Sequence, residues 1–174
     1  MLALHGTVRA DSQAAVDAVR VWSERRDGAT VITIGSSEKG RWPGFGGAFD
    51  ISLPAERVLT VETSNGGVRV DGQRDRLTIQ TSNGPIDVRN AASTLRLRSS
   101  NGNVTASLDR RWSGETIDAR TSNGNVEIAV PAGLRASLQA STNGIVRNEA
   151  NLPTALAGSV PIHATSSNGD VTVR

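Results

Sequence analysis

Hydroxyl and amide side chains recur through this chain in a pattern that could either bind a ligand or hold the fold. Six times two Ser or Thr residues are followed by Asn-Gly, and the six asparagines are Asn65, Asn83, Asn101, Asn123, Asn143 and Asn168. The hydroxyls directly before them belong to Ser64, Ser82, Ser100, Ser122, Thr142 and Ser167. If exposed, such a row could match a polymer or ice through hydrogen bonds. The longer insertions before Asn123 and Asn168 are expected to interrupt the flat surface that this would need.

If stacked, the same amides could hydrogen-bond to one another, as amides do in cross-β assemblies. We favour this interpretation, because Asn and Gly are the residues that a tight turn requires. All six asparagines then form a structural ladder, in which Asn83 and Asn101 have neighbours on both sides and Asn168 is terminal. Asn101→Ala should cost about 1 to 3 kcal/mol, the usual effect of leaving buried polar partners unpaired.

Histidines and carboxylates, the usual groups for acid and base catalysis, are dispersed. The only histidines are His5 and His163, and the chain has no cysteine. Asp71 and Asp75 lie in one connector with two arginines, which is typical of a charged turn and does not single out the acid pair of a glycosidase. The position four residues after each Asn mixes acidic, basic and neutral residues, so it offers no set of oxygen ligands for a cation. The sequence therefore predicts no enzymatic activity, no cofactor and no metal site.

Two other groups of residues could contact a partner. Trp42 and Phe45 lie in a Gly-rich loop, where they could grip a sugar or a protein, or could fold onto the first coil as core side chains. Both interpretations stay open. Arg96, Arg98 and Arg120 fall on the outward phase of neighbouring repeats. They could form a small patch for an anionic partner, but we favour a solvated, salt-bridged face.

The charge balance argues against a nucleic-acid partner. The isoelectric point is about 10.3, yet 19 basic and 17 acidic residues leave a net charge of only +2. Because the chain has no Cys or Tyr and a single lysine, Lys39, almost nothing titrates between histidine and arginine, and the isoelectric point rises without a strong positive charge. Nucleic acid is therefore not the expected partner. A protein or a surface glycan stays open as the partner.

Nothing in the sequence predicts a membrane segment. The first ten residues, MLALHGTVRA, contain an apolar stretch that is interrupted by His5 and Gly6, and this falls short of the core of a signal peptide. No run approaches the ~20 apolar residues that a membrane span needs. The lack of cysteine fits either a reducing or an extracytoplasmic compartment.

Short strands on both sides of each Asn-Gly must position these side chains. Apolar residues stand six and four positions before the Asn and three and five after it, as with Leu77, Ile79, Ile86 and Val88 around Asn83. This period of two indicates strands with one buried face. The asparagines are 18, 18, 22, 20 and 25 residues apart, so each unit should form one coil of an all-β, parallel β-solenoid whose stacked strands bury a continuous apolar column. Two-residue antiparallel hairpins are the alternative.

The fifth unit breaks this register. Before Asn143 the apolar positions carry Ser137 and Gln139. An apolar set displaced by one residue consists of Leu134, Ala136 and Leu138. Since a one-residue slip would turn these side chains to water, we expect a β-bulge in this strand.

One elongated domain is expected over residues 1–174. Residues 59–174 form the repeat stack, and residues 1–58 supply opening strands, because segments 19–22, 30–34 and 49–53 alternate or are β-branched. These strands should cap the stack, whose terminal coil would otherwise offer unpaired backbone groups to another chain. Alternatively, an uncapped sheet edge could pair with a second copy of the chain and form a homo-oligomer.

The repeated units resemble the bacterial toast-rack β-repeat family of adhesin-like proteins. The resemblance is carried by residues 59–68 (LTVETSNGGV), by near copies at 77–88 and 117–128, and by Val130-Pro131 after a strand. It implies a stacked β fold without established enzymatic activity, in a protein that is exported or associated with the cell envelope. It assigns no substrate.

From the repeats and this resemblance we expect a non-catalytic scaffold or adhesin-like binding module of the bacterial cell envelope. Two other classes of protein remain as alternatives. One is a polysaccharide-active β-helix enzyme, which would need an acid pair, and the other is a self-assembling structural protein, which would associate as its concentration rises.

Overall fold

The computed structural model describes residues 3–10, 19–26, 29–36, 45–52 and 54–174. The chain divides into two compact units, Met1–Leu53 and Pro54–Arg174, and each is considered by itself. All of the regular secondary structure in the described residues is β-strand, and these residues form no helix. The all-β class that the period of two predicts is therefore confirmed.

The first unit contains two antiparallel strand pairs. Strand β1 (Ala3–Ala10) pairs with β4 (Phe45–Ser52), and β2 (Val19–Arg26) pairs with β3 (Ala29–Ser36). The strands predicted around 19–22 and 30–34 lie within β2 and β3. That this unit caps the repeats stays a prediction.

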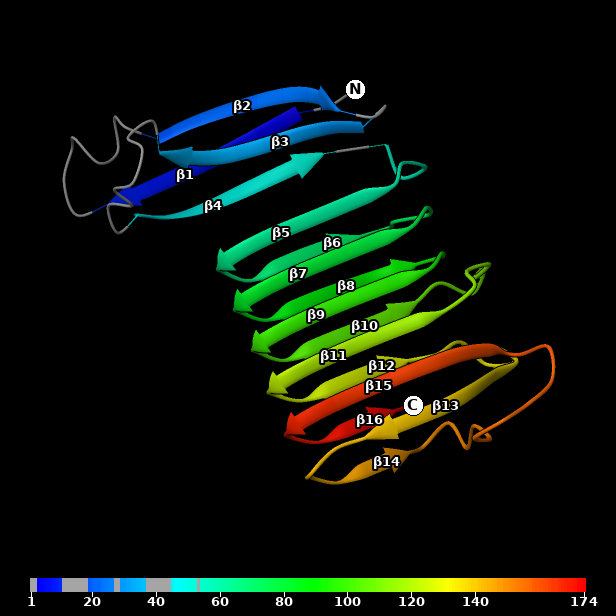
Figure 1. Cartoon of the computed structure of the whole chain (residues 1–174). Helices are drawn as coiled ribbons and strands as arrows, with labels where there is room; N and C mark the ends of the chain where they lie inside the picture. The colour runs from blue at the N-terminus through cyan, green and yellow to red at the C-terminus, as the bar shows by residue number, and fades with distance from the viewer. Residues whose placement is uncertain (1–2, 11–18, 27–28, 37–44, 53) are drawn as a thin grey trace. The chain divides into compact units, whose positions relative to one another are not determined.

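The second unit is a parallel β-solenoid built from two sheets (Figure 1). The strands of the first sheet are β5 (Leu59–Asn65), β7 (Leu77–Asn83), β9 (Leu95–Asn101), β11 (Ile117–Asn123), β13 (Ala136–Ser141) and β15 (Val160–Asn168). The strands of the second sheet are β6 (Val68–Asp71), β8 (Ile86–Ala91), β10 (Val104–Leu108), β12 (Val126–Ala129), β14 (Val146–Asn148) and β16 (Val171–Val173). Each Asn-Gly joins a first-sheet strand to the second-sheet strand of the same coil. We call this turn the corner of the coil.

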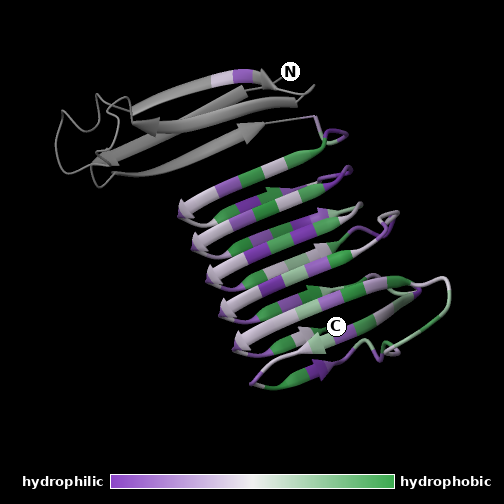
Figure 2. Ribbon diagram, in the orientation of Figure 1, coloured by the Kyte–Doolittle hydropathy of each residue, from purple (hydrophilic) through white to green (hydrophobic). Residues whose placement is uncertain are grey.

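The apolar core lies between the two sheets. Leu77, Ile79, Leu95 and Leu97 of the first sheet are 0 to 1% exposed, and the inward residues of β8, β10, β12 and β16 in the second sheet are buried with them. Hydrophobic and hydrophilic residues alternate along most strands of the solenoid, which is visible as alternating colours in Figure 2. Burial of each Leu or Ile side chain stabilises the fold by about 1.5 to 3 kcal/mol. The predicted apolar column is thus the main support of the solenoid.

The coils do not stack in the order of the sequence. The first sheet has the order β13-β15-β11-β9-β7-β5, and the second has the order β14-β16-β12-β10-β8-β6. The C-terminal coil, β15 and β16, is therefore inserted between the fourth coil and the fifth (Figure 1). Its inward residues Ile162, Ala164, Val171 and Val173 are fully buried, whereas all of β14 is exposed. A complete apolar set suits the interior place, and the irregular fifth unit takes the end of the stack.

The prediction of a β-bulge in the fifth unit is wrong. Strand β13 pairs with β15 without interruption, with Leu138 opposite Ile162. Beyond the corner, Val146 lies opposite Val171. Residues 142–145 thus span the same corner as residues 166–170, so the fifth coil has a corner one residue shorter. This shortening keeps the displaced apolar set directed inward without any bulge.

A bulge occurs instead in β8. The pairing of β8 with β10 shifts after Ala106, so that Leu108 lies opposite Ala91. Asn90 adopts a φ of 51°, a left-handed conformation that Asn tolerates better than most residues. The extra residue lets Ala91 return to the core, where it is fully buried.

Candidate functional site

In the corners after β7, β9, β11 and β15, three of the four motif residues hold one coil against a neighbouring coil. The hydroxyl two residues before the Asn points inward and donates to the Gly carbonyl oxygen of a neighbouring coil. The distances are 3.3 Å from Thr81 Oγ1 to Gly66, 3.0 Å from Ser99 Oγ to Gly84, 2.8 Å from Thr121 Oγ1 to Gly102 and 2.7 Å from Ser166 Oγ to Gly124. These hydroxyls are nearly buried, so the bonds satisfy groups that would otherwise lose water without replacement.

The asparagines form the predicted ladder along the corners. Each Nδ2 donates to the Oδ1 of the preceding rung: Asn83 to Asn65 at 2.9 Å, Asn101 to Asn83 at 2.8 Å, Asn123 to Asn101 at 2.8 Å and Asn168 to Asn123 at 2.9 Å. The insertions before Asn123 and Asn168 leave this register intact, since both residues pair directly with their neighbours. The expectation that the insertions interrupt the surface is wrong, because they emerge at the opposite ends of the strands.

Asn143 is the exception and does not extend the ladder. Because the fifth corner is one residue shorter, Thr142 takes the inward hydroxyl position, and its Oγ1 donates to the Gly169 carbonyl oxygen. Thr142 Oγ1 also accepts the Gly144 N–H at 3.0 Å. The ladder therefore has five members and ends at Asn168.

A second row of polar side chains, which the sequence analysis missed, follows the corner on the second-sheet side. The Oδ1 of Asn103 accepts the Asn125 N–H at 2.9 Å, and the Oδ1 of Asn125 accepts the Asp170 N–H at 2.9 Å. Asp170 Oδ1 in turn accepts the Ile145 N–H at 3.0 Å. The available signal was a short side chain with an oxygen two residues after the Asn in these coils.

The remaining motif residue, directly before the Asn, has no such role. Its side chains are exposed and make no hydrogen bond within the described part of the chain; they belong to Ser64, Ser82, Ser100, Ser122 and Ser167. They form an outward column on the first sheet, beside the ladder. This column is the part of the repeat that the fold leaves for other contacts.

We expect Asn101→Ala to lower the free energy of unfolding by about 1 kcal/mol, because it removes an accepted and a donated bond. Asn168→Ala removes only the donated bond and should cost about half as much. Because the ladder is exposed, the loss of unfolding free energy is expected at the low end of the about 1 to 3 kcal/mol that applies to buried polar partners. Urea unfolding of both variants measures this difference. Equal and negligible changes in unfolding free energy would contradict a stabilising ladder.

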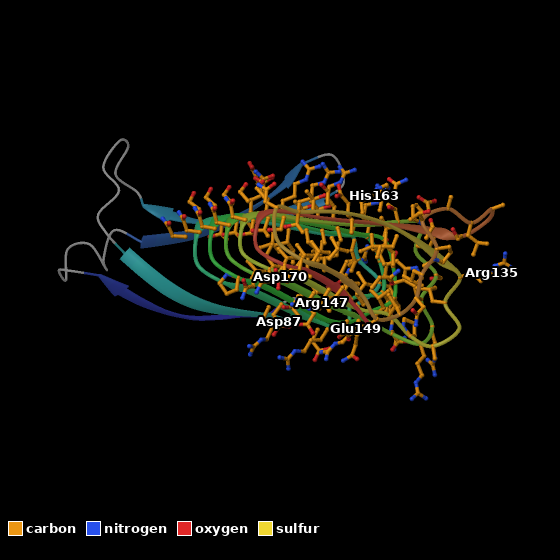
Figure 3. All side chains as sticks on the ribbon, turned by 90° about the horizontal axis from the view of Figure 1, so that it is seen from below. Asp87, Arg135, Arg147, Glu149, His163 and Asp170 are labelled. Atoms are coloured by element: carbon orange, nitrogen blue, oxygen red, sulfur yellow. The ribbon has the colours of Figure 1, made fainter. Side chains whose placement is uncertain are left out.

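The outer face of the second sheet carries ion pairs that join four arginines to three acids. Arg69 Nε lies 3.0 Å from Asp87 Oδ2, and Arg89 binds both carboxylate oxygens of Asp87, at 3.2 and 2.9 Å. Arg147 pairs with Asp170 at 2.7 Å, and Arg174 with Glu127 at 2.7 Å. Figure 3 shows Asp87 projecting from this side and His163 from the opposite one.

These contacts shift two pKa values. At Asp87, burial raises the pKa, but the hydrogen bonds and charges of Arg89 and Arg69 outweigh it and hold the pKa below its ordinary value. At Asp170, the Arg147 side chain and the Ile145 N–H lower the pKa. A carboxyl group whose pKa is lower in the folded state stabilises the fold above its unfolded pKa. That contribution disappears as the pH falls through the folded value.

We therefore expect the melting temperature to fall as the pH drops below the ordinary carboxyl range, and to fall less in Asp170→Asn. The amide in this variant carries no charge at any pH, so the stabilising contacts of the Asp170 carboxylate with Arg147 and the Ile145 N–H are not there to be lost in acid. Thermal melts from neutral to acid pH measure both curves. Parallel curves for the two proteins would contradict a contribution from Asp170.

The outer face of the first sheet differs, because three arginines surround one acid. Asp118 Oδ1 accepts Arg120 Nε at 2.5 Å, and Arg98 Nη2 lies 3.5 Å from Asp118 Oδ2. Arg96 lies directly opposite Asp118 on the neighbouring strand and is exposed, and it makes no ion pair with another described residue. The favoured interpretation of a salt-bridged face holds for Arg98 and Arg120 but not for Arg96.

The other candidates are not brought together. His163 lies on β15 opposite Asp118, and His5 is in β1 of the other unit. Asp75 Oδ1 accepts the backbone N–H of Arg76 at 2.7 Å, which is turn chemistry. Asp71 lines a cleft of about 300 Å³ at the connectors, with Asn90 and Asp109.

Trp42 lies outside the described residues, and so does the side chain of Phe45, the first residue of β4. Their contact with a partner stays a prediction. Among the described residues, no three or more His, Asp or Glu side chains gather as a metal site would require. No helix in the same residues is long and apolar enough to cross a membrane.

Comparison with known families agrees with this architecture. Residues 50–174 match the model of the family described as Toastrack DUF4097. Comparisons with curated proteins and with solved structures gave no significant match. The match covers the whole solenoid and most of the chain, and it confirms the resemblance that the repeated corner motif indicates. The chain belongs to the Toastrack DUF4097 family.

Proposed function

We propose that this chain is a non-catalytic, adhesin-like binding module of the bacterial cell envelope. The solenoid is the scaffold, and the outer face of the first sheet is the binding surface. The observation that carries this proposal is the division of labour in the corner motif. Inward hydroxyl, Asn and Gly are used to join coils, while the outward Ser column is free and regular.

The geometry of this face suits an extended partner. Like strands pair in register from β5 to β15, so outward side chains repeat at about 4.8 Å along the stack. Because the outward side chains alternate with buried ones, the face is supported by the core beneath it. A rigid support loses little conformational entropy when it binds, which favours affinity from many weak contacts.

The absence of catalysis is part of the proposal. It is supported by where the candidate groups lie: His163 and Asp118 are on the outer side of the first sheet, where Asp118 is paired with Arg98 and Arg120, and Asp71 and Asp109 lie at the connectors. Catalysis needs a base, a nucleophile or an acid held together around a reacting atom. The resemblance to adhesin-like proteins supports the envelope location.

Co-sedimentation with a bacterial cell-envelope fraction tests this function. The folded protein should pellet with the envelopes in a saturable manner, and unlabelled protein should displace labelled protein. The heat-unfolded chain serves as the control for nonspecific adhesion. Recovery of the folded protein in the supernatant at every envelope concentration would contradict the proposal.

Self-association is a second candidate function, favoured by the end of the stack. Strand β14 is the outermost strand of the second sheet. Its first residue, Val146, is 45% exposed, and Ile145 directly before it is 55% exposed. Uncovered apolar edges invite pairing with another chain. We expect the apparent mass in light scattering to rise with concentration and Val146→Lys to prevent this. A constant monomer mass would rule out this function.

A further inference from the structure

We infer that the outer face of β9 and β11 binds a linear carboxylated glycan, an inference that rests on the proposed binding function. The site consists of Arg96, Arg98 and Arg120, with Ser100 and Ser122 completing the same two strands. We call these five residues the arginine patch. The patch is a specific feature of this face, because the other strands of the first sheet present hydroxyl, amide and imidazole groups and one carboxylate, that of Glu62, but no arginine.

The arrangement works against the stability of the fold. Arg98 and Arg120 are direct neighbours across β9 and β11, and like charges in this position repel each other. Arg96, Arg98 and Arg120 contribute +3, and Asp118 contributes −1, which leaves +2 on two strands. On the opposite face Arg69 and Arg89 share Asp87, and Arg147 and Arg174 each pair with a carboxylate of their own. Those four arginines therefore leave +1, and none of them lacks an acidic partner as Arg96 does among the described residues. Local rules are broken in this way mainly at functional positions.

Asp118 holds two of the arginines in place and leaves their donors free. Its side chain is only 12% exposed, whereas those of Arg98 and Arg120 are 48% and 52% exposed. Arg120 contacts Asp118 through Nε, so both of its terminal nitrogens remain for a ligand. Arg96 has all of its donors free within the described structure. A guanidinium group presents paired N–H donors that match the two oxygens of a carboxylate.

The surrounding groups fit a sugar polymer. Ser100 and Ser122 are exposed two residues beyond Arg98 and Arg120, so hydroxyl donors and acceptors stand beside the charges. Thr78 and Gln80 on β7 and Thr165 on β15 extend this polar surface on either side. The outward side chains of this face come from neighbouring strands paired in register, so an extended ligand can contact several of them at once. Sugar hydroxyls and uronate carboxylates supply both kinds of group that the patch can bind.

Two other anionic partners fit less well. Single-stranded nucleic acid usually stacks its bases on aromatic side chains, and the only aromatic residue of 54–174 is Trp112, which packs against the core. Membrane-surface binding usually adds exposed apolar side chains to basic ones. The exposed large apolar residues of the described solenoid are Val58, Ile145, Val146 and Leu156, none of which belongs to the first-sheet face.

Two triple variants with the same change in net charge test the site. The patch variant is Arg96→Gln, Arg98→Gln and Arg120→Gln, and the control variant is Arg69→Gln, Arg89→Gln and Arg147→Gln on the opposite face. Sodium alginate, a linear polyuronate, is the probe, and dextran is the neutral polymer. Isothermal titration calorimetry gives Kd, and thermal melts show that each variant is folded.

We expect the whole chain to bind alginate and not dextran, with an affinity that falls as salt is added. The patch variant should bind about tenfold more weakly or worse, and the control variant should stay within about twofold of the original chain. Equal losses in both variants would mean attraction by net charge alone and would overturn the site. Equal or tighter binding of poly(dT) or of anionic lipid vesicles would overturn the choice of glycan.

The outcome separates this inference from the proposed function. If the chain pellets with cell envelopes but fails to bind alginate, the carboxylated-glycan site is wrong and the binding function stands. If it fails with both, the proposed function itself is wrong. If one triple variant does not fold, the single variants Arg96→Gln and Arg69→Gln make the same comparison, with a smaller expected difference of about twofold to threefold.

Discussion

Deletion of residues 160–174 is expected to abolish the cooperative unfolding of the solenoid. These residues form the inserted coil of β15 and β16, which pairs with β11 and β12 on one side and with β13 and β14 on the other. Their removal separates the fifth coil from the stack and exposes the ends of both sheets. Circular dichroism during heating should show a gradual change in place of a sharp transition.

A single substitution tests the same coil without truncation. Ile162 is fully buried between β11 and β13, so Ile162→Ala should lower the free energy of unfolding by about 2 to 5 kcal/mol, as large-to-small changes in cores do. Leu156, in the connector that leads to β15, is 42% exposed and is the matched control. Leu156→Ala should cost less than about 1 kcal/mol. Equal costs would show that the inserted coil is not part of the core.

Gly102→Ala is expected to be the most damaging change at a corner. A Cβ on Gly102 would lie 2.1 Å from the Gly84 carbonyl oxygen, and the φ of Gly102 is +157°. The backbone strain costs about 1 to 3 kcal/mol, and the overpacking against a neighbouring backbone costs about 1 to 3 kcal/mol more. Denaturant unfolding measures the sum.

Gly66→Ala is the matched control, because Gly66 occupies the same motif position in the first coil. Its φ is +129°, and a Cβ there would meet no atom within 4 Å. Only the strain of about 1 to 3 kcal/mol should remain. If the two variants lost the same stability, close stacking of the corners would not be the reason for Gly in the motif.

The sequence predicted the coil and the core well, because both depend on local alternation. Leu95 and Leu97 point inward and Arg96 and Arg98 outward for the same reason, the period of two along a strand. The ladder from Asn65 to Asn123 followed from equal registers in consecutive units. These features need no knowledge of which distant segments meet.

The order of the coils could not be predicted in this way. The units around Asn143 and Asn168 could each have stacked on the fourth coil, and alternation does not state which one does. The corners of the two units make the difference. The corner of the fifth unit is one residue shorter, whereas the last unit has a corner of full length and places Asn168 opposite Asn123. The row of Asn103, Asn125 and Asp170 was missed for the same reason, because its bonds run to backbone N–H groups of coils that are 22 and 45 residues away.

The charged surface was predicted only in part. Arg96, Arg98 and Arg120 were identified as outward-facing from their phase, but their shared partner, Asp118, depends on how β9 and β11 align. Ion pairs on the opposite face likewise join residues from different coils, as with Arg69 and Asp87. Such pairs depend on stacking register, which the sequence specifies only after the coil order is known.

The central claim, binding without turnover, is tested most directly by one time course on a defined polymer. The protein is held with fluorescent alginate of narrow length distribution, and size-exclusion chromatography follows the bound fraction and the polymer length together. We predict that the bound fraction reaches a plateau and stays there while the length of the polymer does not change. A bound fraction that decays as shorter chains accumulate would contradict the account and identify the protein as an enzyme.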